Sequence, residues 1–84
     1  MAHPNCDEQG LLVALLRGSF EYQGQKCSAA SRAYIPKSVW GRIGQNLIDE
    51  VAKISMGDAR DFTNFMTAVI DQRSFDKITG YIER

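Results

Sequence analysis

Apolar side chains recur at helical spacing in three stretches of the chain. The members of the first stretch are Leu11, Leu12, Leu15, Leu16 and Phe20. A period of three to four residues predicts an amphipathic helix. Asn5 and Glu8 precede this stretch as an N-cap and its capping-box partner. Gly24 follows it, and glycine tolerates the left-handed geometry of a helix end. We therefore expect a first helix that ends near Gly24.

The second stretch has the most regular apolar stripe. Its members, spaced by 3, 4, 4 and 3 residues, are Trp40, Ile43, Leu47, Val51 and Ile54. This stripe predicts one buried face of a long helix. Ser38 is the expected cap and Gly57 the expected terminator, and Asp49 and Lys53 stand four residues apart as an ion pair.

The third stretch lies near the C-terminus. Asp71 is the expected cap of a helix whose apolar face carries Phe75, Ile78 and Ile82. No stop signal follows, so we expect this helix to continue to the end of the chain.

The segments between the helices predict a turn, a strand and an irregular crossing. Residues 25–30 are small and polar, and residues 31–35 alternate loosely before Pro36, which is typical of a short strand. Residues 55–67 contain turn formers and three expected buried anchors, Phe62, Phe65 and Met66. The predicted fold is α/β, in the order helix–turn–strand–helix–loop–helix. Because a lone strand leaves its backbone groups unpaired, we expect a piece of a larger protein.

Composition and charge exclude several classes of function. The 84 residues contain 10 Lys and Arg against 10 Asp and Glu, so the net charge is zero. A neutral chain does not favour nucleic acid or a membrane surface. The longest apolar run, residues 11–16, is far shorter than the ~18 residues of a membrane span, and the N-terminus lacks signal-peptide features. A single His and two separate cysteines predict no metal site and a reducing compartment.

Cys27 is the most suggestive residue for chemistry. It follows Gly24 in Gly-Gln-Lys-Cys-Ser-Ala, with Lys26 beside it as a source of positive charge. A thiolate is a good nucleophile, and unpaired backbone N–H groups at a new helical turn would favour it and hold an oxyanion. From the residues alone an inert, half-buried thiol remains the commoner outcome for a cysteine.

Residues 20–32, Phe-Glu-Tyr-Gln-Gly-Gln-Lys-Cys-Ser-Ala-Ala-Ser-Arg, resemble the active-site segment of the aldehyde dehydrogenase superfamily. That signature is an aromatic or aliphatic residue, three variable residues, Gly, Gln or Glu, any residue, Cys, then small residues. Together with Ser-Arg-Ala-Tyr-Ile-Pro and Ala-Val-Ile-Asp at residues 68–71, the segment resembles the delta-1-pyrroline-5-carboxylate (L-glutamate gamma-semialdehyde) dehydrogenase branch. The resemblance covers nearly the whole chain.

The resemblance implies a role for two residues. Cys27 would be the catalytic nucleophile: its thiolate adds to the aldehyde, hydride passes to NAD, and water releases the acid from a thioester. Its backbone N–H would form half of the oxyanion hole. Ser28 would help to bind the substrate carboxylate. From the residues alone, a local turn hydroxyl is an equal alternative for Ser28.

The parts that the family needs and this chain lacks imply a fragment. The general base, the oxyanion asparagine and the glycine-rich cofactor loop have no counterparts in residues 1–84. We expect these residues to be a partial catalytic domain, inactive alone, without cofactor or metal ligands of its own. The parent would be a homo-oligomer of the cytoplasm or the mitochondrial matrix.

Two other classes remain as alternatives. The helix faces would also suit a non-catalytic interaction module. A thiol-redox protein would pair Cys6 with Cys27, but the cysteines stand 21 residues apart without a Cys-x-x-Cys motif.

Overall fold

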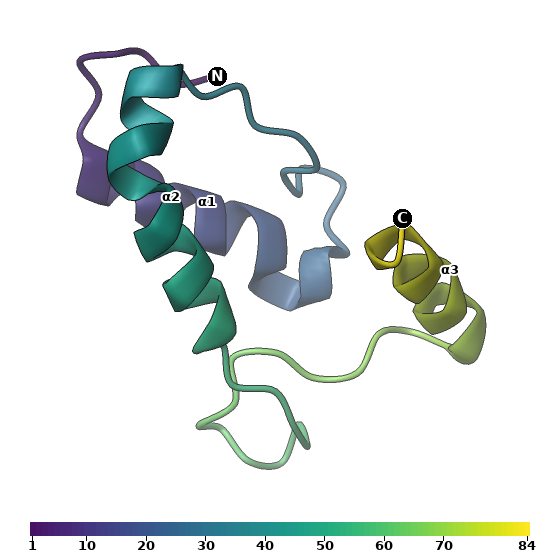
Figure 1. Cartoon of the computed structure of the whole chain (residues 1–84). Helices are drawn as coiled ribbons and strands as arrows, with labels where there is room; N and C mark the ends of the chain where they lie inside the picture. Colours follow the sequence, from purple (N-terminus) through teal and green to yellow (C-terminus); the bar gives the residue numbers. More distant parts are fainter.

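The computed structural model describes all 84 residues, and its regular elements are all helices. In chain order the elements are α1 (Glu8–Phe20), the short 3₁₀ helix η1 (Glu21–Gly24), α2 (Lys37–Ala52) and α3 (Gln72–Ile82) (Figure 1). The three predicted helices are confirmed. None of them has both the length and the apolarity that a membrane span requires.

The core is the contact between α1 and α2. Its buried side chains are Leu12 from α1 and Val39 and Ile43 from α2. Ile43 belongs to the predicted stripe, but Val39, with no exposed surface, is the centre of the contact, and Trp40 is 45% exposed. The Trp40 ring lies over Gly44, where an added Cβ would stand 2.9 Å from the ring. The buried face of α2 therefore shares Ile43 with the predicted stripe but contains Val39 in place of Trp40.

The predicted helix ends and ion pair need correction. Asp7 rather than Asn5 is the N-cap of α1, and its side chain makes no capping hydrogen bond. Pro36 precedes α2, which ends at Ala52, before Gly57. Lys53 pairs with Glu50 at 3.0 Å instead of Asp49, whose carboxylate accepts from Gln45.

The predicted strand at residues 31–35 does not form. The segment is an irregular connection, and its one long-range backbone hydrogen bond is from the Ala2 N–H to the Tyr34 carbonyl at 2.8 Å. A strand requires a neighbouring strand to pair with, and none lies beside this segment. The β pairing that does form is an isolated parallel bridge between Met56 and Met66.

The crossing between α2 and α3 is irregular, as predicted, but it is poorly anchored. Backbone bonds from Phe65 and Met66 to the Ser55 carbonyl close its base at 3.1 and 3.0 Å. Phe62 is 96% exposed and Phe65 is also exposed, so they are not buried as expected. Met66 is half-buried.

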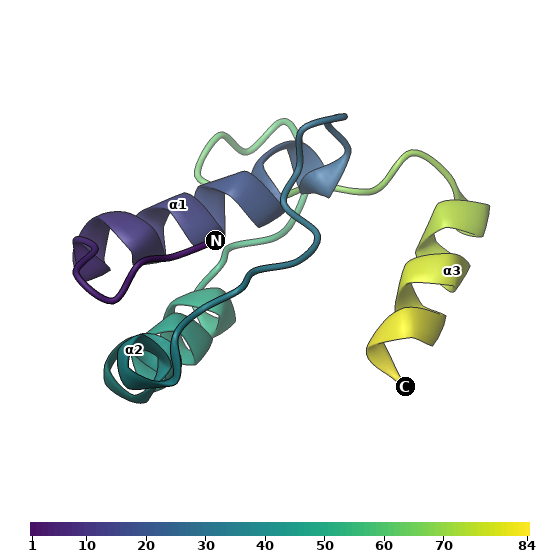
Figure 2. The ribbon, with the colours of Figure 1, turned by 90° about the horizontal axis from the view of Figure 1, so that it is seen from above.

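Helix α3 lies apart from the other two. The confirmed cap is Asp71, whose carboxylate accepts the Ser74 N–H at 2.7 Å. Figures 1 and 2 show α3 separated from the α1–α2 pair in both views, and it packs on no other helix. Its apolar face is exposed, with Ile82 at 79%.

The molecule as a whole exposes more surface than its size predicts. Its accessible surface is 6822 Å², whereas a folded monomer of 9.4 kDa has about 5,000 Å². Large apolar side chains of α3 and of the crossing are among those exposed.

Candidate functional site

The backbone before Cys27 makes an unusual left-handed turn. Tyr22, Gln23 and Gly24 have φ angles of 55°, 58° and 67° in succession. Such angles cost non-glycine residues energy. At Gly24 glycine is required, since an added Cβ would stand 2.8 Å from the Ser19 carbonyl oxygen. The turn ends α1 and leads the chain abruptly into the cysteine segment.

Cys27 lies on an exposed turn that starts at Lys26 and is closed by the Ala29 N–H donating to the Lys26 carbonyl at 3.1 Å. The thiol is free and exposed. No helix begins here. The expectation that N–H groups at the start of a helical turn surround the sulfur is therefore wrong. The Cys27 N–H nevertheless donates to no acceptor of the chain, and it remains available to a ligand oxygen.

Ser28 is exposed beside Cys27, and its hydroxyl makes no hydrogen bond within the chain. The local turn therefore does not use this hydroxyl. Cys6 is half-buried and also free, so the two thiols do not form a disulfide in this structure. No group of three His, Cys, Asp or Glu side chains gathers as metal ligands.

The positive charge of Lys26 is paired with a carboxylate. Lys26 Nζ lies 3.0 Å from Glu21 Oε2, and Arg17 lies 3.9 Å from the other Glu21 oxygen. The hydrogen bond and charge of Lys26, followed by the charge of Arg17, lower the pKa of Glu21 below its usual value. A carboxylate with a lowered pKa is a weak base, which argues against Glu21 as a general base.

Two glutamine side chains tie this region to a distant segment. Gln23 Nε2 donates to Thr67 Oγ1 and, at 3.4 Å, to the Ala68 carbonyl. Gln25 Oε1 accepts the Ile70 N–H at 3.0 Å. Gln25 occupies the Gln-or-Glu position of the motif, but its partner stands 45 residues later. The sequence carries no signal for that pairing, so these two residues were missed.

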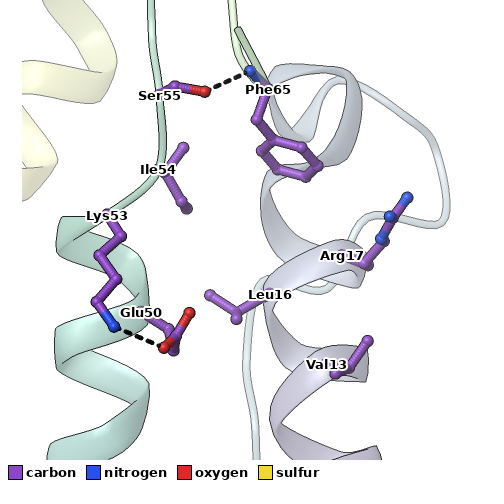
Figure 3. Close-up of a pocket in the computed structure, with 8 residues that line it drawn as sticks. All are labelled: Val13, Leu16, Arg17, Glu50, Lys53, Ile54, Ser55 and Phe65. Atoms are coloured by element: carbon purple, nitrogen blue, oxygen red, sulfur yellow. Dashed lines mark hydrogen bonds and ion pairs between the residues drawn. The ribbon is translucent and has the colours of Figure 1, made fainter. Parts of the chain in front are cut away.

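A separate cavity of about 260 Å³ lies between α1 and the end of α2 (Figure 3). Leu16, Ile54 and Phe65 line it, and the Lys53–Glu50 pair stands at its edge. Its lining contains neither Cys27 nor Ser28. The cavity therefore does not belong to the thiol site.

Comparison with known sequences covers the whole chain. The model of the "Aldehyde dehydrogenase family" matches residues 1–84. The chain is 51% identical over 81 residues to the mitochondrial delta-1-pyrroline-5-carboxylate dehydrogenase of Dictyostelium discoideum. It is 45% identical over 82 residues to the human enzyme of the same name. These alignments include 96% of this chain but 14% and 15% of the two relatives.

Solved structures agree with this assignment. The delta-pyrroline-5-carboxylate dehydrogenase of Mycobacterium tuberculosis matches 98% of this chain with a TM-score of 0.92 and 49% identity, over 15% of its own length. A second structure of that enzyme, which matches equally well, is bound with NAD. A match this extensive in sequence and in backbone shows that the chain belongs to the aldehyde dehydrogenase family.

Proposed function

We propose that residues 1–84 are the nucleophile-bearing part of the catalytic domain of an NAD-dependent dehydrogenase. The enzyme oxidises L-glutamate gamma-semialdehyde, the open form of delta-1-pyrroline-5-carboxylate, to glutamate. One observation supports this most strongly: an exposed Cys27 thiol with an unpaired backbone N–H stands in a chain 51% identical to such an enzyme over 81 residues.

The chemistry assigned to this chain is covalent addition. The Cys27 thiolate attacks the aldehyde carbon, a C–S bond forms, and the carbonyl π electrons move to oxygen. The Cys27 N–H, which has no partner in the chain, donates to this developing oxyanion. Ser28, with its hydroxyl free, binds the substrate carboxylate. Cys27 is thus the catalytic residue and Ser28 a substrate-binding residue.

The residues present do not fit NAD. A dinucleotide site needs a strand followed by a glycine-rich loop and a helix, and this chain has no strand and no such loop. We assign the hydride-accepting cofactor, the general base and the second oxyanion donor to parts of the enzyme outside residues 1–84. The isolated chain should therefore show no steady NADH formation with the semialdehyde.

The connection at residues 31–35 supports a place in a larger sheet. Apart from the Tyr34 carbonyl, its backbone groups make no hydrogen bond within the chain. Unpaired N–H and C=O groups of an extended, exposed segment can pair with another strand. In the complete enzyme we place this segment as a strand against strands that the 84 residues do not contain. This keeps the α/β class for the parent, which we propose to be a homo-oligomer of the cytoplasm or the mitochondrial matrix.

The test is substitution of each cysteine in the longer enzyme that carries this segment. Cys27→Ala should lower NADH formation from the semialdehyde by at least about 10³-fold, because it removes the proposed nucleophile from this turn. Cys6→Ala is the matched control and should leave the rate within a fewfold of the parent. Normal turnover by the Cys27→Ala enzyme would refute the proposal.

A non-catalytic interaction module is the second candidate, and the exposed apolar face of α3 favours it. The Cys27→Ala substitution, combined with removal of residues 72–84, separates the two candidates. If Cys27→Ala has no effect on turnover, whereas removal of residues 72–84 abolishes capture of a partner protein, the module is the better description.

A further inference from the structure

Two glutamines flank Gly24 at the start of the cysteine segment, and both reach the same stretch of chain. Gln23 donates to Thr67 and Ala68, and Gln25 accepts from Ile70. We propose that Gln23 and Gln25 are positioning residues that hold the Cys27 turn against residues 67–70. We call the bonds of Gln23 and Gln25 to residues 67–70 the glutamine clamp. The clamp rests on hydrogen-bond geometry, and only its importance for catalysis rests on the proposed function of Cys27.

The turn needs an external tie because its local contacts are weak. Tyr22 and Gln23 adopt left-handed angles that a free chain would leave. The Lys26–Glu21 ion pair is solvent-exposed, and such pairs contribute little. The backbone bond from Ala30 to the Gly18 carbonyl, 2.8 Å long, fixes the far side of the turn. The glutamine bonds fix the near side, so Cys27 lies between two tied points.

The two amides work through opposite ends, and their partners determine which end. The Ile70 N–H can only donate, so Gln25 must present its oxygen. The Ala68 carbonyl can only accept, so Gln23 must present its nitrogen. Replacement by glutamate therefore has opposite consequences at the two positions. Gln25→Glu keeps an acceptor for the Ile70 N–H. Gln23→Glu keeps only the bond to Thr67, whose hydroxyl can donate to the carboxylate, and it places that carboxylate against the Ala68 carbonyl oxygen.

The experiment is amide hydrogen exchange by NMR on the full 84-residue chain and three variants. Two amides report: the Ile70 N–H, which donates to Gln25, and the Ala29 N–H, which closes the Cys27 turn and is hydrogen-bonded to neither glutamine. Gln25→Leu should speed exchange at both amides by about three- to tenfold, the effect of one lost hydrogen bond. Gln25→Glu should leave both rates unchanged, and Gln23→Glu should speed exchange at Ala29.

The amides of Leu12 and Ile43 in the helix pair serve as the folding control. If Gln25→Leu changes exchange at these two control amides, the comparison of Gln23→Glu with Gln25→Glu still tests the proposal, because both variants add the same charge two positions apart. Equal effects of Gln23→Glu and Gln25→Glu would overturn the proposal. An Ile70 amide that exchanges without protection in the unvaried chain would also overturn it. So would an Ala29 exchange rate that stays the same in all three variants. These readouts do not depend on turnover, so failure of the clamp and failure of Cys27 as nucleophile are distinguishable.

Discussion

Gly24 carries the sharpest conformational demand on a single residue. Its φ of 67° is left-handed, and an added Cβ would meet the Ser19 carbonyl oxygen at 2.8 Å. We expect Gly24→Ala to lower the free energy of unfolding by at least about 1–2 kcal/mol, the cost of a left-handed alanine, and more from the clash. Urea unfolding followed by circular dichroism measures this.

The matched control for Gly24 is Gly41, a glycine within α2 with open space around its Cβ position. Gly41→Ala should raise the free energy of unfolding by about 0.5–1 kcal/mol, because alanine is the better helix former. The same sign for both variants would contradict the geometry at Gly24.

Val39 tests which face of α2 is buried. It has no exposed surface, whereas Trp40 is 45% exposed. Val39→Ala should lower the free energy of unfolding by about 1.5–3 kcal/mol through lost burial and an unfilled space. Trp40→Ala should lower the free energy of unfolding by less than the size of the side chain suggests, because much of Trp40 is exposed. If Trp40→Ala proves far more damaging than Val39→Ala in the same unfolding experiment, the predicted stripe, and not the observed core, describes the chain.

At Cys27 the structure changes which neighbour matters. Lys26 seemed suited to favour the thiolate, but its ammonium group is paired with Glu21. The Cys27 N–H and the neighbouring Ser28 hydroxyl are the polar groups left unpaired at the proposed nucleophile. The reactivity that we propose for this site toward an aldehyde would therefore depend on the geometry of the turn, which we propose the two glutamines hold.

Helix α3 forms as its own sequence predicts, although it packs on no other helix. Its cap, Asp71, accepts the Ser74 N–H, and this bond lowers the pKa of Asp71 below its usual value. A lowered pKa means that the ionised form stabilises the helix. That stabilisation is complete above the ordinary aspartate pKa and is lost as the pH falls through the lower folded value.

We therefore expect the first turn of α3 to loosen on acidification below the ordinary aspartate pKa and to be unaffected near neutrality. The Ser74 amide shift and exchange rate, followed by NMR against pH, report this directly. Asp71→Asn is the control, since asparagine also caps helices but does not titrate in this range. A Ser74 transition that persists in the Asn variant would show that another group is responsible.

The connection at residues 31–35 shows the opposite behaviour at the same scale. Its sequence is typical of a strand, yet no strand forms, because a strand's hydrogen bonds come from a neighbouring strand. A helix satisfies its backbone within four residues. Helices are therefore retained in an isolated part of a fold, whereas single strands are not.

At the scale of the whole molecule, the chain is one helix pair with a separate third helix. The Cα radius of gyration is 14.2 Å, against about 12 Å for a compact domain of this length. Together with the excess exposed surface, this describes apolar faces that no part of the chain covers. This chain corresponds to 14–15% of the length of two of its relatives, and we propose that parts of the enzyme outside residues 1–84 cover these faces.

We expect removal of residues 72–84 to leave the α1–α2 pair unchanged, since α3 packs on neither helix. Amide spectra of Leu12, Val39 and Ile43 should superimpose on those of the full chain, and the exchange rates should agree. Large shifts at these three residues would mean that α3 folds back onto the pair in solution. The spectrum of Val39→Ala is the positive control, because this substitution should shift the amide signals of the α1–α2 pair.

The amino-acid sequence alone determined the three helices, the Asp71 cap, the glycine that ends the first helical region and the cysteine motif of the family. All of these depend on residues within a few positions of one another. Tertiary structure decided that Val39 is buried and that residues 31–35 do not pair as a strand. It also decided that two glutamines meet a segment 44 to 45 residues later. Those features require partners brought close by folding, and no local pattern specifies a partner that is distant in the chain.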